Sequence, residues 1–246
     1  MSRLHENVMR VLMGDIVSRR VPVGGWLPRE VDVAAQFRVS RGVARECIRG
    51  LEERGLVAVK HGRGAIVSPE ARWNVLDPDV LGALLDSGRG AAILGEYLES
   101  RRILEIAAAG LAAERAREIH LTALSDAFDR MAAAAEHAIE SPAAEELYHE
   151  ADIAFHRALI DATGNRALGS LTEPIHRALI AARRPLARPD ARLERSLPEH
   201  RRILAAVAQA DPPAARDAMR DHLLTVEAYL REYAGRALAA GETDRR

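Results

Sequence analysis

Residues 39–57 read VSRGVARECIRGLEERGLV, and this stretch decides the fold of the N-terminal third of the chain. Ser40 is a favourable helix N-cap and Gly55 a favourable helix stop, so a helix is predicted between them, ending near Arg54. Its apolar residues recur at helical spacing and share one side: Val43, Ala44, Cys47, Ile48 and Leu51. Three arginines recur every four residues on another side: Arg41, Arg45 and Arg49. One face of this helix therefore packs and the other is cationic.

Two further helices are predicted before this one, and a hairpin is predicted after it. An amphipathic pattern covers residues 3–19 and is broken by the proline and two glycines that follow. Residues 27–30 (Leu-Pro-Arg-Glu) open a second short helix. After the third helix, residues 56–59 and 65–67 are short strand-like runs around a basic, glycine-containing tip at 60–64. Three short helices followed by a β-hairpin predict a winged helix-turn-helix domain.

The distribution of charge supports a nucleic-acid partner for this domain. Residues 1–69 carry 12 Arg or Lys and 7 Asp or Glu, and the remainder carries 23 and 29, although the whole chain has a net charge of only −1. A positive module on an acidic remainder is typical of a polyanion-binding domain joined to a domain of another kind. In a winged helix-turn-helix the third helix enters the major groove of DNA, and the wing reaches the flanking backbone or minor groove. Arginine suits this role because its planar fork holds a phosphate or a guanine edge with two hydrogen bonds.

Four segments of this third resemble the GntR-type winged-helix transcription regulators, in the order and at the distances of that family. They are residues 27–30, 39–46, 51–57 and 62–67, so the resemblance covers nearly all of residues 5–69. The resemblance implies that the operator is contacted from the recognition helix and from the wing tip. The residues concerned are Ser40, Arg41, Gly42, Arg45, His61 and Gly62.

Two positions depart from the pattern of the family. Val31 stands where the family often has an arginine, and Arg29, two residues earlier, is the candidate to replace that contact. Gly42 stands where threonine is common, which removes one side-chain contact at the start of the recognition helix. Arg49 is added to the predicted DNA-binding residues because it continues the series of arginines on the cationic side of the recognition helix. The predicted DNA-binding residues are therefore Arg29, Ser40, Arg41, Gly42, Arg45, Arg49, His61 and Gly62.

The chain beyond residue 69 is predicted to be an all-α bundle, which makes the fold class mainly α. Turn signals divide it into about seven helices, near 78–86, 91–116, 119–138, 143–162, 166–183, 190–209 and 212–235. No convincing strand interrupts them. The predicted organisation is a winged helix-turn-helix domain over 1–69, a linker over 70–78, a helical ligand-binding and dimerisation domain over 79–236, and a flexible tail over 237–246.

Four ionisable side chains point into the predicted bundle. Asp152 and His156, four residues apart, share a helix side with apolar residues, and His200 and His222 each lie on the apolar side of a later helix. Buried ionisable groups are costly unless they are paired or bound to a metal. One carboxylate and three imidazoles suit a borderline divalent ion such as Zn²⁺, Ni²⁺, Mn²⁺ or Fe²⁺. The set is predicted to bind such an ion. For each histidine taken alone, a hydrogen-bonded core position is the alternative.

Arg101 is the candidate for binding an anionic ligand. It lies on the inward side of the helix predicted over 91–116, with Glu105 one turn later. An inward arginine in a bundle either pairs with a carboxylate of the protein or receives one from a ligand. Both alternatives remain open, with Glu99 or Glu105 as the internal partner in the first.

This second part resembles the FCD ligand-binding domain of the FadR-like branch of the GntR family. The resemblance is carried by residues 101–105, 152–156, 164–165 and 199–203 and by His222. It implies that the aspartate and three histidines hold a divalent metal, whose open positions receive a carboxylate effector that Arg101 also grips. Residues 73–78 (Trp-Asn-Val-Leu-Asp-Pro) resemble the linker of members that respond to sugar acids such as galactonate or gluconate.

The expected function is that of a homodimeric transcription regulator, a repressor released from its operator by a small carboxylate. The operator is expected to be a double-stranded inverted repeat, because one recognition helix covers a half-site and two-fold operators match two-fold proteins. One alternative is a DNA-binding scaffold with a structural metal and no effector. Another is a metal-dependent hydrolase, although no inward carboxylate stands out as a general base beside the cluster.

Cysteine usage and hydropathy bear on the compartment. Cys47 is the only cysteine, so an intramolecular disulfide or a CxxC zinc site is excluded and a reducing compartment is expected. The chain has no apolar run of about 18 residues and no signal-peptide pattern. A cytoplasmic protein without a membrane partner is therefore expected.

Overall fold

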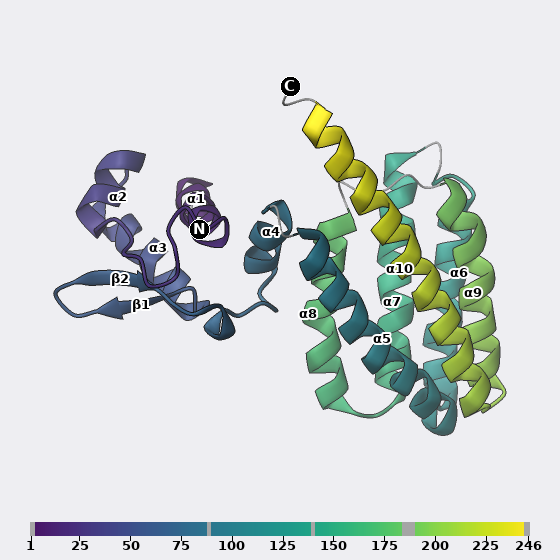
Figure 1. Ribbon diagram of the computed structural model, residues 1–246. Coiled ribbons are helices and arrows are strands. Elements are labelled where there is room, and N and C mark those ends of the chain that lie inside the picture. The colour runs from purple at the N-terminus through teal and green to yellow at the C-terminus, as the bar shows by residue number, and fades with distance from the viewer. Residues whose placement is uncertain (1–2, 88–89, 139–140, 184–189, 244–246) are drawn as a thin grey trace. The chain divides into compact units, whose positions relative to one another are not determined.

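The computed structural model describes residues 3–87, 90–138, 141–183 and 190–243, with side chains described over 4–87, 92–138, 141–176 and 195–229. Contacts between Cα atoms divide the chain into two compact units, Met1–Ile93 and Leu94–Arg246. Each unit is a fold of its own (Figure 1).

The first unit is a winged helix-turn-helix domain followed by one more helix. Its elements are α1 (Arg3–Val17), α2 (Glu30–Phe37), α3 (Arg41–Glu53), β1 (Val57–Lys60), β2 (Gly64–Val67), a 3₁₀ turn (Glu70–Arg72) and α4 (Pro78–Asp86). The two strands are antiparallel and pair from Val57 opposite Val67 to Lys60 opposite Gly64. The predicted fold class and the order of elements are confirmed, and each predicted boundary lies within a few residues of the observed one.

The recognition helix α3 begins and ends where its sequence predicts. Ser40 Oγ accepts a hydrogen bond from the backbone N–H of Val43 at 3.2 Å, which satisfies one of the open donors of the first turn. At the other end, Gly55 has a φ of +73°, and a Cβ there would collide with the carbonyl oxygen of Arg72. Only glycine fits this position without strain. The apolar side of α3 is buried through Ala44, Cys47, Ile48 and Leu51.

The segment after the wing folds back and joins the winged domain. Trp73 is buried, and its indole Nε1 donates a hydrogen bond to the Ser68 carbonyl oxygen at 3.0 Å. Asp77 caps α4 by accepting hydrogen bonds from the N–H groups of Asp79 and Val80. Helix α4 contacts α1 and buries three apolar side chains, Val80, Leu81 and Leu84. The linker is thus an ordered part of this unit.

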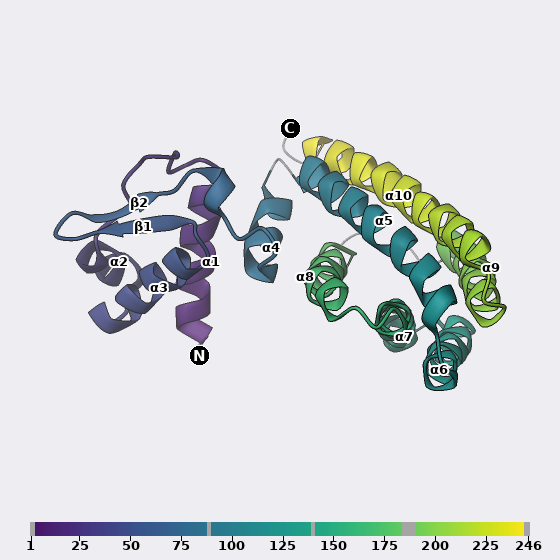
Figure 2. The same ribbon diagram turned by 90° about the horizontal axis from the view of Figure 1, so that it is seen from below.

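The second unit is a helical bundle. Its helices are α5 (Gly90–Arg115), α6 (Glu118–Ala135), α7 (Pro142–Ala162), α8 (Arg166–Arg183), α9 (Asp190–Ala208) and α10 (Pro212–Thr243). Helix α6 packs between α7 and α9, α8 packs on the other side of α7, and α10 packs on α9. Seen along the bundle, α5 lies beside α10 and faces α7 (Figure 2). No helix in the described part of the chain is long and apolar enough to span a membrane.

The core of the bundle is built from small and large apolar residues of α5, α6, α7, α9 and α10, with Leu124, Met131, Tyr148, Phe155 and Ile203 among the buried ones. Helix α10 continues to Thr243, whereas the sequence predicts its end near 235 and a tail over 237–246. The stretch after residue 235 is rich in alanine and has no proline, and the helix continues through it, Gly241 included. Residues 244–246 lie outside the described residues.

Candidate metal centre and nucleic-acid interface

The cationic face of α3 is open to solvent, as the sequence predicts. Arg41, Arg45 and Arg49 are all exposed. Arg45 pairs with Glu30 of α2 at 3.2 Å, and Arg49 pairs with Glu53 one turn later at 3.1 Å. Exposed pairs of this kind contribute little to stability and separate readily. These arginines are therefore available to exchange a carboxylate for a phosphate or a base edge.

The wing carries its polar groups at the tip of the β1–β2 hairpin. His61, Gly62 and Arg63 are exposed, and Gly62 has a φ of +70°, which the tight turn requires. Arg29 and Gly42 are also exposed, near the starts of α2 and α3. The structure places every predicted DNA-binding residue on the surface of the winged domain, and their contacts with DNA stay a prediction.

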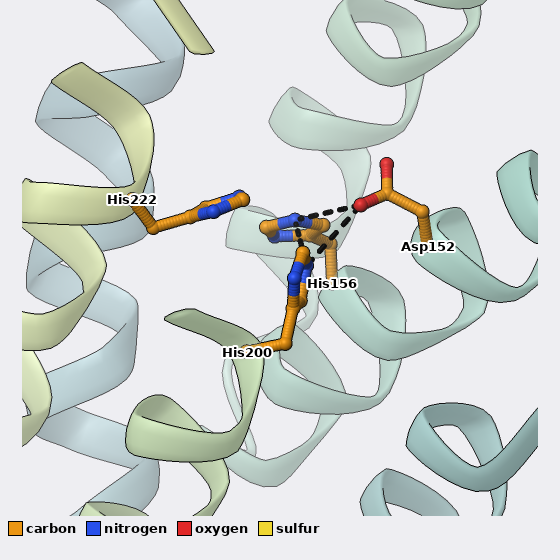
Figure 3. A group of neighbouring side chains, drawn as sticks. All are labelled: Asp152, His156, His200 and His222. Atoms are coloured by element: carbon orange, nitrogen blue, oxygen red, sulfur yellow. Dashed lines mark hydrogen bonds and ion pairs between the residues drawn. The ribbon is translucent and has the colours of Figure 1, made fainter. Parts of the chain in front are cut away.

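The bundle brings together the four residues predicted to bind a metal. Asp152 and His156 come from α7, His200 from α9 and His222 from α10 (Figure 3). All four are buried, and their candidate ligand atoms lie within 4.8 Å of one another. His200 Nε2 lies 3.2 Å from Asp152 Oδ1 and 3.4 Å from His156 Nε2. Residues up to 70 positions apart in the sequence thus form one cluster.

Hydrogen bonds at Nδ1 orient two of the imidazoles. His200 Nδ1 donates to the Ser196 carbonyl oxygen at 2.8 Å, and His222 Nδ1 lies 3.0 Å from Glu199 Oε2. Because each Nδ1 carries the proton, Nε2 is left with its lone pair directed into the cluster. His222 Nε2 is buried and has no hydrogen-bond partner in the described structure. Such outer partners are typical of histidines that ligate metals.

His156 lies between Glu105 and Arg101 of α5. Its Nδ1 lies 2.7 Å from Glu105 Oε2, and its Nε2 lies 2.9 Å from Arg101 Nη2. Glu105 Oε1 also accepts a hydrogen bond from Arg101 Nε at 2.6 Å and lies 2.6 Å from His176 Nε2 of α8. The Arg101–Glu105 pair, one of the two alternatives left open by the sequence, is therefore present beside the cluster.

Burial governs the ionisation of these groups. Burial lowers the pKa of His156 to about 4. The Glu105 carboxylate acts to raise this pKa and the Arg101 charge acts to lower it, and the effect of burial is the largest. Burial also lowers the pKa of His222 well below its ordinary value. For Glu105, burial alone would raise the pKa. The charges of Arg101, His156 and His176 outweigh it and hold the pKa of this carboxyl well below its usual range. At neutral pH His156 and His222 are therefore neutral, and Glu105 is ionised.

The donor set fits a divalent cation. Three imidazole Nε2 atoms and one carboxylate oxygen converge, and all four are lone-pair donors. In a buried site such atoms repel one another unless a proton or a cation lies among them, and the pKa of His156 argues against a proton. Nitrogen and oxygen ligands in this ratio suit Zn²⁺, Ni²⁺, Mn²⁺ or Fe²⁺. Four protein ligands leave positions for an exogenous ligand on an ion that takes five or six.

Several residues of this site are not predicted from the sequence. Glu199 and Ser196 support two histidines, and His176 holds Glu105. The signal for His176 is its place beside Thr172 and Ile175 on the buried side of a helix. A polar residue on the buried side of a helix requires a hydrogen-bond partner. Which partner it finds depends on the packing of α8 against α5, which periodicity does not reveal.

Comparison with known families identifies both units. The model of the bacterial regulatory proteins of the gntR family matches residues 4–67, and the model of the FCD domain matches residues 96–225. The chain is 30% identical over 216 residues to the galactonate operon transcriptional repressor of Escherichia coli (strain K12), covering 87% of this chain and 90% of that one. It is 35% identical over 206 residues to the HTH-type transcriptional regulator LutR of Bacillus subtilis (strain 168), covering 82% and 89%.

The chain is also similar to a solved structure over most of its length. The Streptococcus agalactiae GntR structure aligns with a TM-score of 0.51 and 28% sequence identity, covering 91% of this chain and 98% of that one. The similarity therefore extends over both units, from the winged domain to the bundle.

Proposed function

Because the chain belongs to the GntR family of bacterial regulatory proteins and carries an FCD domain, we propose that it is a repressor released from its operator by a small carboxylate bound at a divalent cation. The coarser part of this function follows from the family: the chain is a DNA-binding transcription regulator of the repressor type, with an effector-binding FCD domain. The family and its members are transcription regulators and not enzymes, so the hydrolase alternative is wrong.

One observation carries the metal-dependent part of the proposal. Four potential ligand atoms from three helices converge within 4.8 Å, hydrogen bonds at Nδ1 orient His200 and His222, and His156 Nδ1 lies 2.7 Å from Glu105 Oε2. A bound divalent cation supplies a Lewis acid with positions that carboxylate oxygens can take. Asp152, His156, His200 and His222 would hold that cation.

Arg101 is the residue proposed to bind the carboxylate. Its guanidinium lies against His156 Nε2, and its side chain is almost completely buried. A buried arginine binds a carboxylate with two parallel hydrogen bonds, which also sets the orientation of the ligand. Sugar acids are the first class to test, since a relative is named as the galactonate operon repressor.

The DNA-binding part of the proposal assigns roles on the winged unit. Arg41, Arg45 and Arg49 of α3 face the major groove, and Ser40 and Gly42 lie at the start of that helix. His61 and Gly62 at the wing tip contact the DNA beside them, and Arg29 replaces the phosphate or base contact of the arginine common at position 31. One such surface covers one half-site. The functional unit is therefore proposed to be a homodimer on an inverted repeat.

Release from DNA requires that the carboxylate bind one arrangement of the dimer more tightly than the other. A 100-fold preference would change the free energy of operator binding by about 2.7 kcal/mol. The chain's own contribution is to place Arg101, from α5, next to ligands from α7. A ligand that bridges these groups links two helices of the bundle.

A thermal-shift screen tests the proposal. Purified protein would be loaded with Zn²⁺ or Mn²⁺, or stripped with a chelator, and mixed with sugar acids, hydroxy acids and dicarboxylates. We expect at least one acid class to raise the melting temperature of the loaded protein only, and the same acid to weaken binding to an operator selected from random DNA. Arg101→Ala should lose the response to the acid, whereas Arg130→Ala, which removes an exposed arginine of α6, should keep it.

The opposite outcomes are equally clear. If chelation lowers the melting temperature and no acid of any class raises it or weakens operator binding, the metal is structural and the chain is a DNA-binding scaffold without an effector. If chelation and metal addition change nothing, the cluster does not hold a metal.

A further inference from the structure

The guanidinium of Arg101 occupies the lone pair that a metal would need. Its Nη2 lies 2.9 Å from His156 Nε2, and arginine nitrogens only donate hydrogen bonds, so His156 Nε2 must accept. In a neutral imidazole the ring proton then lies on Nδ1, which is 2.7 Å from Glu105 Oε2. One lone pair serves either a guanidinium or a metal ion, and not both.

Glu105 holds Arg101 in this position. Its Oε1 accepts from Arg101 Nε at 2.6 Å and lies 2.6 Å from His176 Nε2, and its Oε2 faces His156. The carboxylate is fully buried. Helices α5, α7 and α8 therefore meet at this one side chain, and the arginine is fixed in place by a network and not by a chance rotamer.

We propose that Arg101 is a built-in placeholder for the metal, which must leave His156 Nε2 for the cation to bind and thereby becomes free to take the effector carboxylate. This inference rests on the proposed function, since it concerns the same site. In the metal-free protein, the guanidinium supplies the positive charge that the four converging lone pairs require. In the loaded protein, Nη2 has lost its acceptor and needs another. Metal binding thus prepares the carboxylate site, and the two ligands bind in that order.

Metal affinity of variants tests this inference without any effector. Stripped protein would be titrated with Zn²⁺ in competition with a chromophoric chelator, for the wild type, Arg101→Met, Arg101→Lys and the control Arg130→Ala. We expect Arg101→Met to bind Zn²⁺ at least tenfold more tightly than the wild type, equivalent to about 1.4 kcal/mol. Arg101→Lys should be several-fold tighter, because a single ammonium nitrogen cannot bond Glu105 and His156 as the guanidinium does. Arg130→Ala should stay within twofold.

Two results would overturn the inference. Zinc affinity of Arg101→Met equal to or weaker than that of the wild type means that the arginine does not compete. Equal affinities for Arg101→Lys and the wild type, with Arg101→Met tighter, mean that only repulsion between like charges is at work. Failure of the proposed function is distinguished from these, because it appears as loaded wild-type protein that responds to no acid.

A measurement on the wild type keeps the inference testable if Arg101→Met does not fold. The side-chain nitrogen resonances of Arg101, assigned by their loss in Arg101→Lys, should shift when one equivalent of Zn²⁺ is added. Unchanged Arg101 resonances in a protein that has bound Zn²⁺ would overturn the displacement.

Discussion

Two arginine–glutamate pairs show how environment changes the role of the same chemistry. Arg45 and Glu30 on the winged unit lie 3.2 Å apart with side chains 69% and 37% exposed, whereas Arg101 and Glu105 in the bundle lie 2.6 Å apart and are 3% and 0% exposed. Water replaces the partner of an exposed charge at little cost, but a buried charge that loses its partner is left unsolvated. The first pair is suited to exchanging partners, and the second to fixing a structure.

The two pairs should differ most in how much stability is lost when the glutamate of each is replaced by alanine. Glu105→Ala leaves Arg101 buried without its carboxylate and removes the support of His156, so we expect a loss of about 3–5 kcal/mol in the free energy of unfolding of the bundle. Glu30→Ala should change the stability of the winged unit by less than about 0.5 kcal/mol. Urea unfolding of stripped protein, followed by far-UV circular dichroism, measures both. Equal losses would contradict the comparison.

Lowering the pH should also reduce the stability of the protein, through the buried histidines. The pKa of His156 is about 4 in the folded protein and about 6.5 in the unfolded chain, and the pKa of His222 is lowered in the same direction. Both folded-state values are depressed, so the stability that the neutral histidines provide is complete above about pH 6.5 and is lost as the pH falls toward 4. In metal-free protein, each histidine contributes up to about 1.4 kcal/mol per pH unit to the slope of the unfolding free energy against pH.

Unfolding free energies at a series of pH values between 7 and 5 check this slope, and His222→Gln should reduce it by about half. A stability that stays constant over this range would mean that the histidines are not buried in their neutral form.

On the exposed side, the expected effects concern DNA and not stability. Arg45→Ala should weaken operator binding by about 1–3 kcal/mol and leave the unfolding free energy unchanged, because its glutamate partner remains solvated. If the contact is to a phosphate, the dependence of affinity on salt should also fall by about one ion. Arg202→Ala, which removes an exposed arginine of the bundle paired with Asp221, is the matched control. Fluorescence anisotropy on a selected operator measures all three proteins.

Arg54 lies between these extremes and should give an intermediate result. It is about one-fifth exposed and bonds both Asp77 and Asp79 at the start of α4, at 3.2 and 2.8 Å. We expect Arg54→Ala to lower the stability of the winged unit by about 1 kcal/mol. Arg19→Ala, whose pair with Glu70 is largely exposed, should lower it less. Unfolding monitored by tryptophan fluorescence distinguishes them, since Trp26 and Trp73 both lie in this unit. A larger loss for Arg19→Ala would mean that exposure does not rank these pairs.

Local chemistry explains which parts of the structure could be predicted. Helix boundaries follow from caps such as Ser40 and Asp77, because these act within four residues. The four cluster residues could be predicted because each lies on an apolar helix face, which must point inward. The partners of those residues, Glu199 and His176 among them, depend on how distant helices pack, and no periodicity encodes that.

The position of α4 also decides where the winged helix-turn-helix domain can be cut for fusion to another protein. A cut at residue 69, where the wing ends in the sequence, would discard Trp73, the Arg54 ion pairs and the three apolar side chains that α4 buries. The stretch that travels as a self-contained piece runs to the end of α4 at Asp86. Chimeric biosensors that fuse this module to a foreign sensor should place their junction after that helix.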